Sequence, residues 1–476
     1  HGSRRSVISR RRSSRRSVHG CAAARPSGTP ACVPLPATES NRKAVLIVID
    51  GLTPSMFEAA VGDPRTPTLT ALAERGRYAR AVSTFPSLTP VCLSSIVTGA
   101  HPDVHHIPHL VWWHRGEQRL VEYGSSFAAV RAAGVARSLL DTVINMNREH
   151  LSRGAVTLFE ALEDAGLTTA AINITCYRGR TPHRPTLRGI TIPAYGPKRF
   201  FYYNLFESDT TGAPLAVAAR AAGSIDGYAA SVGRWLVTRD GFDFLAFYLP
   251  DYDFASHVSG PDAAHEALAR ADAAVGALLA AAGGVDEFLD RYAVVLCSDH
   301  GQTRVTDHAT LRGAVGTGAR ITASNRAAMV YTDDAQRVAH ALDGEESVGV
   351  VIFRVEGESY VRRDGEEARL VPGMATDLLA DVPDGVERAF AASRNPNAGE
   401  VIVSAAPGYE FADLAGRHHV GGGSHGSLFA GDSEVPMLTI GLDAVPRSIV
   451  DVAPTLIEHF GVEPPAYQLR ALSRAV

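Results

Sequence analysis

Acidic residues and histidines stand where apolar segments of the chain end. Asp50 follows the apolar run 45–49, and Asp299 and His300 come shortly after the run 292–297. A carboxylate and an imidazole side by side fit a buried core poorly, but both are common ligands of divalent metal ions. The pattern predicts a metal site where these segments end.

A second set of potential ligands lies elsewhere in the chain. Asp253 follows the apolar run 242–249, and His257 comes four residues later, so one helical turn would bring both side chains to the same ion. His425 lies in the glycine-rich segment 421–426, where the backbone can approach a ligand closely. Each group alone is equally typical of a protein surface or a connecting loop. The two sets together could hold two divalent cations.

Thr89 is the candidate nucleophile. It precedes Pro90 and an apolar segment, so the simplest interpretation is that Thr89 caps a helix whose first residue is Pro90. The same position also suits catalysis, because a hydroxyl at a helix N-terminus lies at the positive end of the helix dipole. A bound metal ion would lower the pKa of that hydroxyl further and produce an alkoxide near neutral pH.

The elements that would position these residues alternate between strands and helices. Predicted strands cover 45–49, 168–174, 242–249 and 292–297, and predicted helices cover 66–75, 90–98, 157–165 and 263–282. This order predicts an α/β fold, a three-layer α/β/α sandwich around a mostly parallel central sheet. Ligands bind at the carboxyl edge of such sheets, which is where the acids would meet.

The chain divides by composition into segments. Residues 1–42 are rich in arginine, serine and proline and are predicted to form a disordered basic tail, because they contain too little apolar surface to fold. The tail contains no apolar stretch typical of an export signal. Residues 43–324 and 411–476 carry the alternating pattern and are expected to form the core. Residues 325–410 contain short strands and glycine turns and are predicted to form a smaller α+β subdomain.

Composition argues against several classes of protein. The net charge is −5: residues 1–43 carry +9 and the remainder carries −14, so no nucleic-acid-binding module is expected in that acidic remainder. No uncharged apolar stretch of about 18 residues or more is present, and no transmembrane segment is predicted. The five cysteines are odd in number and lack Cys-x-x-Cys spacing, which disfavours a disulfide framework or a thiolate zinc site. A single bridge between Cys21 and Cys32 stays open.

The order of these motifs resembles the alkaline phosphatase superfamily, and within it the nucleotide pyrophosphatase/phosphodiesterase branch. The similarity extends from about residue 43 to residue 465. The residues that carry it are Asp50, Thr89-Pro90, Ile96-Val97-Thr98-Gly99, His101-Pro102 with His105, Asp253 with His257, Gly260-Pro261, Ser298-Asp299-His300-Gly301 and Ser424-His425-Gly426. Each motif alone is weak, whereas the combination is specific.

The resemblance implies a site with two zinc ions, or with Mn²⁺ or another divalent metal in their place. One ion would be held by Asp253, His257 and His425, and the other by Asp50, Asp299, His300 and the Thr89 oxygen. Thr89 would attack phosphorus and form a covalent phospho-threonine, which water then hydrolyses. Two cations about 4 Å apart would also neutralise charge on the phosphoryl oxygens.

Two positions depart from the pattern of the branch. Three residues after the nucleophile the branch usually has Asn, whereas this chain has Cys92, whose thiol is a far weaker donor to a phosphoryl oxygen than an amide. His105 and His106 stand where the branch usually has His-Gly. Nucleotide specificity is therefore left open. The candidate substrate-binding residues are Cys92, Asn147 and Asn173, with Asn145 as a further possible amide donor.

The expected function is hydrolysis of a small-molecule phosphate ester by a phosphodiesterase or nucleotide pyrophosphatase. A phosphonate hydrolase or a phosphomonoesterase on the same scaffold is the nearest alternative. A non-catalytic metal-binding relative is the alternative of a different class. Sulfatase chemistry is disfavoured because the Cys/Ser-x-Pro-x-Arg motif is absent. Weaker alternatives are Cys92 as the nucleophile and a further metal site among His101, His105, His106, His109 and His114.

Overall fold

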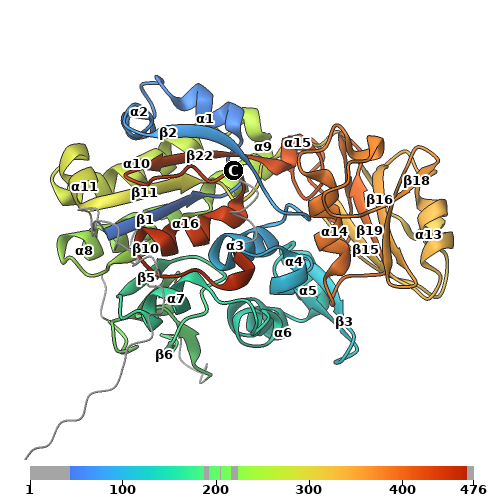
Figure 1. The fold of residues 1–476 in the computed structure, drawn as a ribbon, viewed down its shortest axis with the longest axis horizontal. Helices are drawn as coiled ribbons and strands as arrows, with labels where there is room; N and C mark the ends of the chain where they lie inside the picture. The colour runs from blue at the N-terminus through green and yellow to red at the C-terminus, as the bar shows by residue number, and fades with distance from the viewer. Residues whose placement is uncertain (1–42, 187–191, 204, 216–222, 469–476) are drawn as a thin grey trace, which may run out of the picture. The chain divides into compact units, whose positions relative to one another are not determined.

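The computed structural model describes residues 43–186, 192–203, 205–215 and 223–468. The predicted tail, residues 1–42, lies outside these ranges. The described residues form an eight-stranded sheet, a six-stranded sheet and four two-stranded pairs (Figure 1).

The eight-stranded sheet is parallel through its centre and antiparallel at its edges. Its strands, in spatial order, are β2 (Arg77–Val82), β22 (Glu434–Ile440), β11 (Tyr292–Cys297), β1 (Lys43–Ile49), β10 (Phe244–Leu249), β5 (Thr169–Ile172), β8 (Arg199–Tyr202) and β9 (Phe206–Ser208). The strands from β11 to β8 run parallel, whereas β22, β2 and β9 pair antiparallel with their neighbours. The prediction of a mostly parallel sheet is confirmed.

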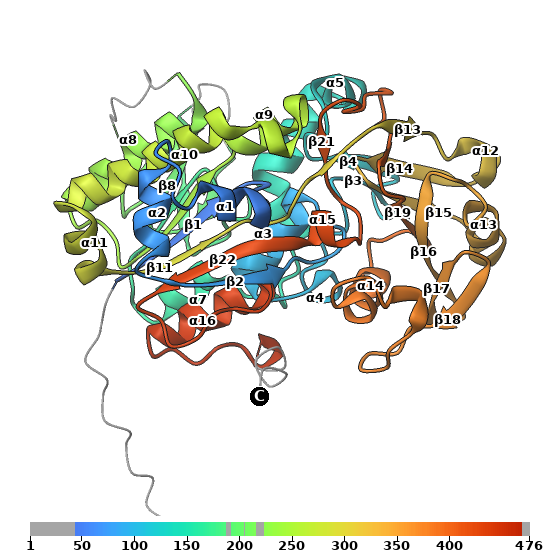
Figure 2. The same cartoon turned by 90° about the horizontal axis from the view of Figure 1, so that it is seen from above.

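Helices cover both faces of this sheet, so the three-layer prediction is also confirmed (Figure 2). Val45 and Ile47 of β1 pack towards a first group of helices on one face of the sheet, and Leu46 and Val48 pack towards a second group on the other face. Strands buried on both faces are expected to be apolar without alternation, as β1 is. The first group is α1 (Pro54–Ala60), α2 (Pro67–Ala73), α8 (Ile225–Thr238), α10 (His265–Ala282) and α11 (Val285–Arg291), and the second includes α3 (Thr89–Thr98), α7 (Leu158–Asp164) and α16 (Val452–His459).

Among the described residues, no single helix is long and apolar enough to cross a membrane. The helices α10 and α11 satisfy that test only when taken together, and they are bent by 76° at their junction.

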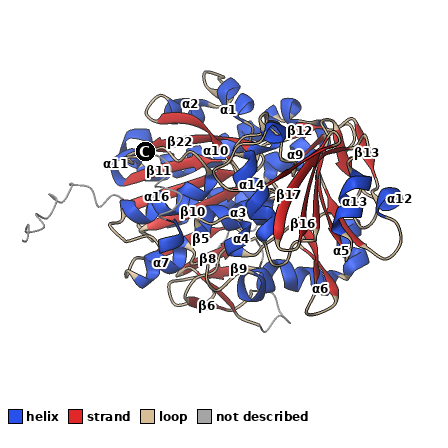
Figure 3. Ribbon diagram, turned by 45° about the vertical axis from the view of Figure 1, so that its right-hand side comes forward, coloured by secondary structure: helices blue, strands red, loops and turns tan. Residues whose placement is uncertain are grey.

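The six-stranded sheet is antiparallel throughout (Figure 3). One face packs on α13 (Ala335–Leu342), and the other packs on α14 (Gly385–Arg394). The sheet overlaps the predicted subdomain at 325–410 and begins slightly before it; the division into domains stays a prediction. The strands, in spatial order, are β14 (Arg320–Ser324), β15 (Ala327–Tyr331), β19 (Val401–Ala405), β16 (Val348–Val355), β17 (Glu358–Arg363) and β18 (Glu366–Arg369).

Two buried arginines connect the six-stranded sheet to loops beside the larger sheet. Arg326, in the turn between β14 and β15, pairs with Asp432 at 2.8 and 2.9 Å. Arg388 of α14 donates to the Thr84 carbonyl at 3.2 Å and to Ser87 Oγ at 3.3 Å. Burial lowers the pKa of Arg388 to about 10. The first contact fixes the β14–β15 turn to α15 (Ala430–Ser433), and the Arg388 contacts fix α14 relative to the loop that precedes Thr89.

Removing one partner of the buried pair should destabilise the fold strongly. The side chains of Arg326 and Asp432 are 1% and 0% exposed, so Arg326→Met would leave the Asp432 carboxylate buried without its cation. Such a loss costs about 3–5 kcal/mol. Urea unfolding measures the effect.

The exposed pair Arg369–Glu358 provides the matched control. Arg369→Met should cost about 1 kcal/mol or less, because solvent screens an exposed pair. A similar loss of stability in both variants would contradict the anchoring role of Arg326.

Candidate metal centre

The acidic residues meet because the strands that precede them are neighbours. β1 pairs in parallel with β10 on one side and with β11 on the other. Asp50 follows β1, and Asp299 follows β11. After β10 the chain enters α9 (Asp251–Ser259), whose first turn carries Asp253. The carboxyl ends of parallel strands lie at one edge of a sheet, so the three carboxylates converge there.

Two groups of potential ligands result. In each group the ligand atoms lie within 4.8 Å of one another, and all of the residues are buried. The first group is Asp50, Asp299 and His300, and the second is Asp253, His300 and His425. His300 belongs to both, and its ring stacks on that of His425 with centroids 3.6 Å apart.

His425 reaches the site from a segment more than 100 residues away from His300. The strand β21 (Gly423–Ser424) pairs with β12 (Thr303–Arg304), which follows His300 closely. The Nδ1 atom of His425 lies 2.8 Å from the Ser87 carbonyl, which assigns the N–H to Nδ1 and leaves a lone pair on Nε2. Nε2 is therefore the atom available to a cation.

His257 lies beside the second group without belonging to it. Its Nε2 is 3.2 Å from Asp253 Oδ2, and its Nδ1 is 2.9 Å from the Gly423 carbonyl. Burial alone would lower the pKa of His257, but the Asp253 carboxylate raises it above its ordinary value. Burial likewise opposes ionisation of Asp253, but the neighbouring histidines outweigh it and lower its pKa.

Thr89 is the first residue of α3, and Leu88 is its N-cap. The prediction that Thr89 itself caps the helix is therefore wrong by one position. The Thr89 hydroxyl faces the candidate site, where its Oγ1 lies 3.1 Å from His300 Nε2. Thr89 is partly exposed, so the hydroxyl is placed between the buried histidine and solvent.

One oxygen of each carboxylate in the first group lacks a hydrogen-bond donor among the described residues. No hydrogen bond from the described residues reaches Asp50 Oδ1 or Asp299 Oδ2, although both are buried. These oxygens lie 3.4 and 3.5 Å from His300 Nε2, and His300 Nδ1 is 3.0 Å from the Gly301 carbonyl. If Nδ1 carries the proton, Nε2 presents a lone pair to two carboxylates. Oxygen and imidazole lone pairs directed at one point suit a divalent cation.

Burial and like charge act on the same carboxylates. Burial first, and then the charges of Asp299 and Asp253, raise the pKa of Asp50 well above its ordinary value. Burial also raises the pKa of Asp299. The protein alone therefore favours protonated carboxyls here, whereas a bound cation would favour the ionised form.

Two residues outside the predicted set orient these carboxylates. The Tyr248 hydroxyl donates to Asp50 Oδ2. The Gln302 side-chain amide donates to Asp253 Oδ1. The Ser256 hydroxyl in turn donates to Gln302 Oε1. Sequence reasoning missed both, although Gln302 directly follows Asp299-His300-Gly301 and Tyr248 is a hydroxyl within an apolar run.

Gly51 and Gly426 permit close approaches that a side chain would prevent. A Cβ on Gly51 would lie 2.7 Å from Asp253 Oδ1, and the Gly51 amide donates to Asp299 Oδ1 at 3.2 Å. A Cβ on Gly426 would lie 3.0 Å from Leu88 and 3.3 Å from the Arg326 amide nitrogen. Both glycines have positive φ, at 69° and 117°. The loop before Thr89 and the β14–β15 turn thus meet at Gly426.

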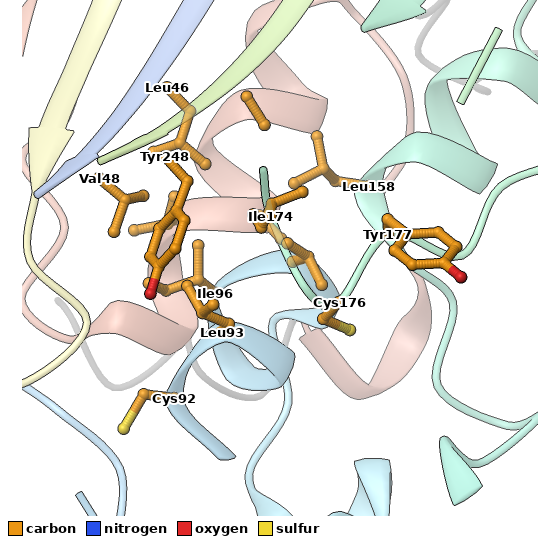
Figure 4. Packing of buried hydrophobic residues seen from close by; sticks show 14 of the residues in the cluster. Leu46, Val48, Cys92, Leu93, Ile96, Leu158, Ile174, Cys176, Tyr177 and Tyr248 are labelled. Carbon is orange, nitrogen blue, oxygen red and sulfur yellow. The ribbon is translucent and has the colours of Figure 1, made fainter. Parts of the chain in front are cut away.

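Cys92 faces the protein interior. Its Sγ is 3.2 Å from Ser83 Oγ, and Cys92 belongs to the same buried cluster as Leu93 and Ile96, with its sulfur directed away from them (Figure 4). Burial, and then the charge of Asp299, raise the pKa of Cys92 well above its ordinary value. A buried thiol that stays protonated is a poor nucleophile.

The predicted asparagines have protein partners in the described structure. The Asn147 amide donates to the Thr175 carbonyl at 2.8 Å, and the Asn173 amide donates to the Ile225 carbonyl at 3.4 Å. The Asn145 amide donates to Asp141 at 2.7 Å.

The further histidines do not form a metal cluster among the described residues. Neither ligand group includes His101, His105, His106, His109 or His114. His105 lies 3.2 Å from Ser95 Oγ, and His109 lies 3.2 Å from the Ala327 carbonyl. Burial lowers the pKa of His109 to about 4. These two histidines act as buried hydrogen-bonding groups.

The fold has close counterparts among solved structures. Phosphonoacetate hydrolase from Sinorhizobium meliloti 1021, in complex with phosphonoformate, matches with a TM-score of 0.58 and 17% identity over 89% of this chain and 96% of that chain. An inactive variant of murine ectonucleotide pyrophosphatase/phosphodiesterase 5, in complex with AMP, matches with a TM-score of 0.60 and 14% identity over the same shares. The human ectonucleotide pyrophosphatase/phosphodiesterase 5 matches with a TM-score of 0.57 and 14% identity. A search of curated proteins finds no match.

The match to a family model, together with the fold, identifies the chain as a member of the alkaline phosphatase superfamily. The sequence model of the type I phosphodiesterase/nucleotide pyrophosphatase family matches residues 44–428. The chain belongs to that family. Its members depend on divalent metals, and the two ligand groups of this chain fit that requirement.

Binding of zinc should release protons from the metal-free protein. Asp50, Asp299 and His257 all have raised pKa values, so each holds its proton to a higher pH than usual. A metal ion must displace those protons, so its apparent affinity should rise with pH and fall on acidification. Calorimetric titration with zinc in buffers of different ionisation enthalpy counts the protons.

The variant Asp50→Asn should release fewer protons when zinc binds. Asp272→Asn is the control, because Asp272 is a buried carboxyl that accepts hydrogen bonds from the backbone of α2, away from the site. Zinc binding that is independent of pH and releases no protons would contradict the prediction that zinc displaces protons from the candidate ligands.

Proposed function

We propose that this protein hydrolyses small phosphate esters, most simply diesters, through a covalent phospho-threonine on Thr89. The observation that carries the proposal is the position of the Thr89 hydroxyl, 3.1 Å from His300 Nε2 and at the N-terminus of α3, beside two buried Asp/His groups. Membership of the phosphodiesterase family supports the same reaction class.

Two zinc ions are the proposed cofactors, with Mn²⁺ or another divalent metal as the alternative. Asp/His sets without thiolates suit zinc in a catalytic site. Bound cations would supply Lewis acidity to the phosphoryl group and a lowered pKa to an oxygen nucleophile. The ligands would be divided between the ions as Asp50, Asp299, His300 and Thr89 for one, and Asp253, His257 and His425 for the other.

The protein's own groups would organise both halves of the reaction. In the first, the Thr89 Oγ–phosphorus bond forms as the bond to the leaving oxygen breaks; the hydroxyl gives up its proton, and the leaving oxygen takes up a proton and departs as an alcohol. In the second, water cleaves the phospho-threonine, which returns the hydroxyl and releases a phosphate monoester. Two displacements predict net retention at phosphorus. The dipole of α3 favours negative charge at Thr89 in both steps.

A phosphonate hydrolase is the second candidate. The similar fold of the phosphonoacetate hydrolase supports it, together with Cys92 at a position where the branch usually has Asn. A non-catalytic relative fits less well, because both ligand groups and the Thr89 hydroxyl are present in this chain.

Thr89→Ala should lower the turnover of bis-p-nitrophenyl phosphate by about 10³-fold or more, because the nucleophile is removed. Zinc content should stay close to that of the unmodified protein, since the carboxylates and imidazoles remain. Steady-state kinetics and metal analysis on the same samples measure both quantities.

Thr89→Ser is the matched control, since it keeps the hydroxyl and should keep most of the activity. Near-normal turnover by Thr89→Ala would refute the phospho-threonine.

A panel of phosphate diesters, monoesters and phosphonates, run with and without chelator, decides the substrate class. Diesters should be turned over fastest, and the activity should disappear with chelator and return with zinc. Turnover of phosphonates alone would favour the second candidate. Two bound zinc ions without turnover of any substrate would contradict the proposed enzymatic function.

A further inference from the structure

We propose that the side-chain amide of Asn325 binds a non-bridging oxygen of the substrate's phosphoryl group. Asn325 lies in the β14–β15 turn of the six-stranded sheet, more than 200 residues from Thr89, and was not among the candidates from sequence. The inference rests on the proposed function, since it assigns a substrate contact to that site.

Asn325 is held at the turn of the β14–β15 hairpin, against the second ligand group. Its side-chain nitrogen Nδ2 lies 3.2 Å from His425 Nε2, and the residue is 5% exposed. Ser324 Oγ donates to Asn325 Oδ1 at 2.8 Å, which identifies Nδ2 as the atom that faces the histidine. The backbone φ of 56° is the left-handed conformation that Asn tolerates well.

The present acceptor of this amide is the lone pair that a cation would take. Because Nδ1 of His425 bonds to the Ser87 carbonyl, Nε2 is the only ring nitrogen with a free lone pair. A cation on Nε2 therefore deprives the Asn325 amide of its acceptor. A buried donor without an acceptor is unfavourable, and a phosphoryl oxygen bound beside His425 would satisfy it.

The other candidate donors would keep their acceptors when a cation binds. Asn147 and Asn173 donate to backbone carbonyls, which a cation at the site does not take. The Cys92 thiol faces Ser83 in the interior. Of these side chains, the amide of Asn325 is the one whose acceptor is a candidate metal ligand.

The turn is fixed firmly enough to act as a binding group. The Arg326 amide donates to the His425 carbonyl at 2.9 Å, and the Arg326 guanidinium pairs with Asp432. Asp432 in turn accepts from the Ser427 amide at 2.8 Å. Gly426 lets the turn approach Leu88, the neighbour of Thr89. The amide is thus preorganised beside both the nucleophile loop and the ligand group.

Asn325→Gly tests the proposal, because glycine accepts the positive φ and removes only the side chain. The zinc-loaded variant should bind inorganic phosphate about tenfold to a hundredfold more weakly in calorimetry, as expected for losing a hydrogen bond to a charged group. Its zinc content and melting temperature should stay close to those of the unmodified protein. The matched control is Asp364→Gly, an exposed residue with φ of 53° in the β17–β18 turn of the same sheet, which should not change phosphate affinity.

Phosphate affinity within about twofold of the unmodified protein would overturn the inference. Loss of zinc from Asn325→Gly would overturn it too, because the amide would then act by holding His425. The outcome is separable from that of the proposed function. If the unmodified protein binds phosphate but turns over no ester, the proposed function fails, while the difference in phosphate affinity still decides the role of Asn325.

Discussion

Three buried carboxylates that meet at one edge of a parallel sheet are the constraint on which the site depends. Asp50, Asp253 and Asp299 follow adjacent strands, so the topology forces them together. Burial, and then the charges of Asp299 and Asp253, raise the pKa of Asp50 well above its ordinary value. Neighbouring histidines and the Tyr248 hydroxyl relieve only part of this repulsion. Divalent cations would relieve the remaining repulsion. The convergence of carboxylates that the fold imposes therefore also accounts for the proposed metal chemistry.

Much of this could be predicted from sequence because the signals are local. An apolar run that ends in an acid identifies both a buried strand and a residue at its carboxyl edge, as with Asp50 and Asp299. His425 was harder, since a glycine-rich loop has no periodicity; the segment 421–426 marked it only as a candidate, and the resemblance to a family implied its place in a ligand set. Tyr248, Gln302 and Asn325 were missed because their roles depend on tertiary contacts. Thr89 was predicted as the nucleophile, but its capping role was wrong by one position, because sequence patterns locate the end of a helix only approximately.

The six-stranded sheet and the helix α14 also help to position the candidate site. Arg388 of α14 bonds to the loop that precedes Thr89, and Ser87 of that loop accepts the hydrogen bond that orients His425. The β14–β15 turn approaches from the same sheet and contacts His425 directly. The nucleophile loop and the candidate ligand therefore share supports that come from one structural element.

The central claim is that the convergent carboxylates and histidines form a site for two cations. Anomalous diffraction from zinc-loaded crystals, recorded on both sides of the zinc absorption edge, tests it most directly. The account predicts two peaks, one among Asp50, Asp299 and His300 with the Thr89 oxygen, and one among Asp253, His257 and His425. Zinc bound elsewhere, or no peak between these side chains, would contradict it.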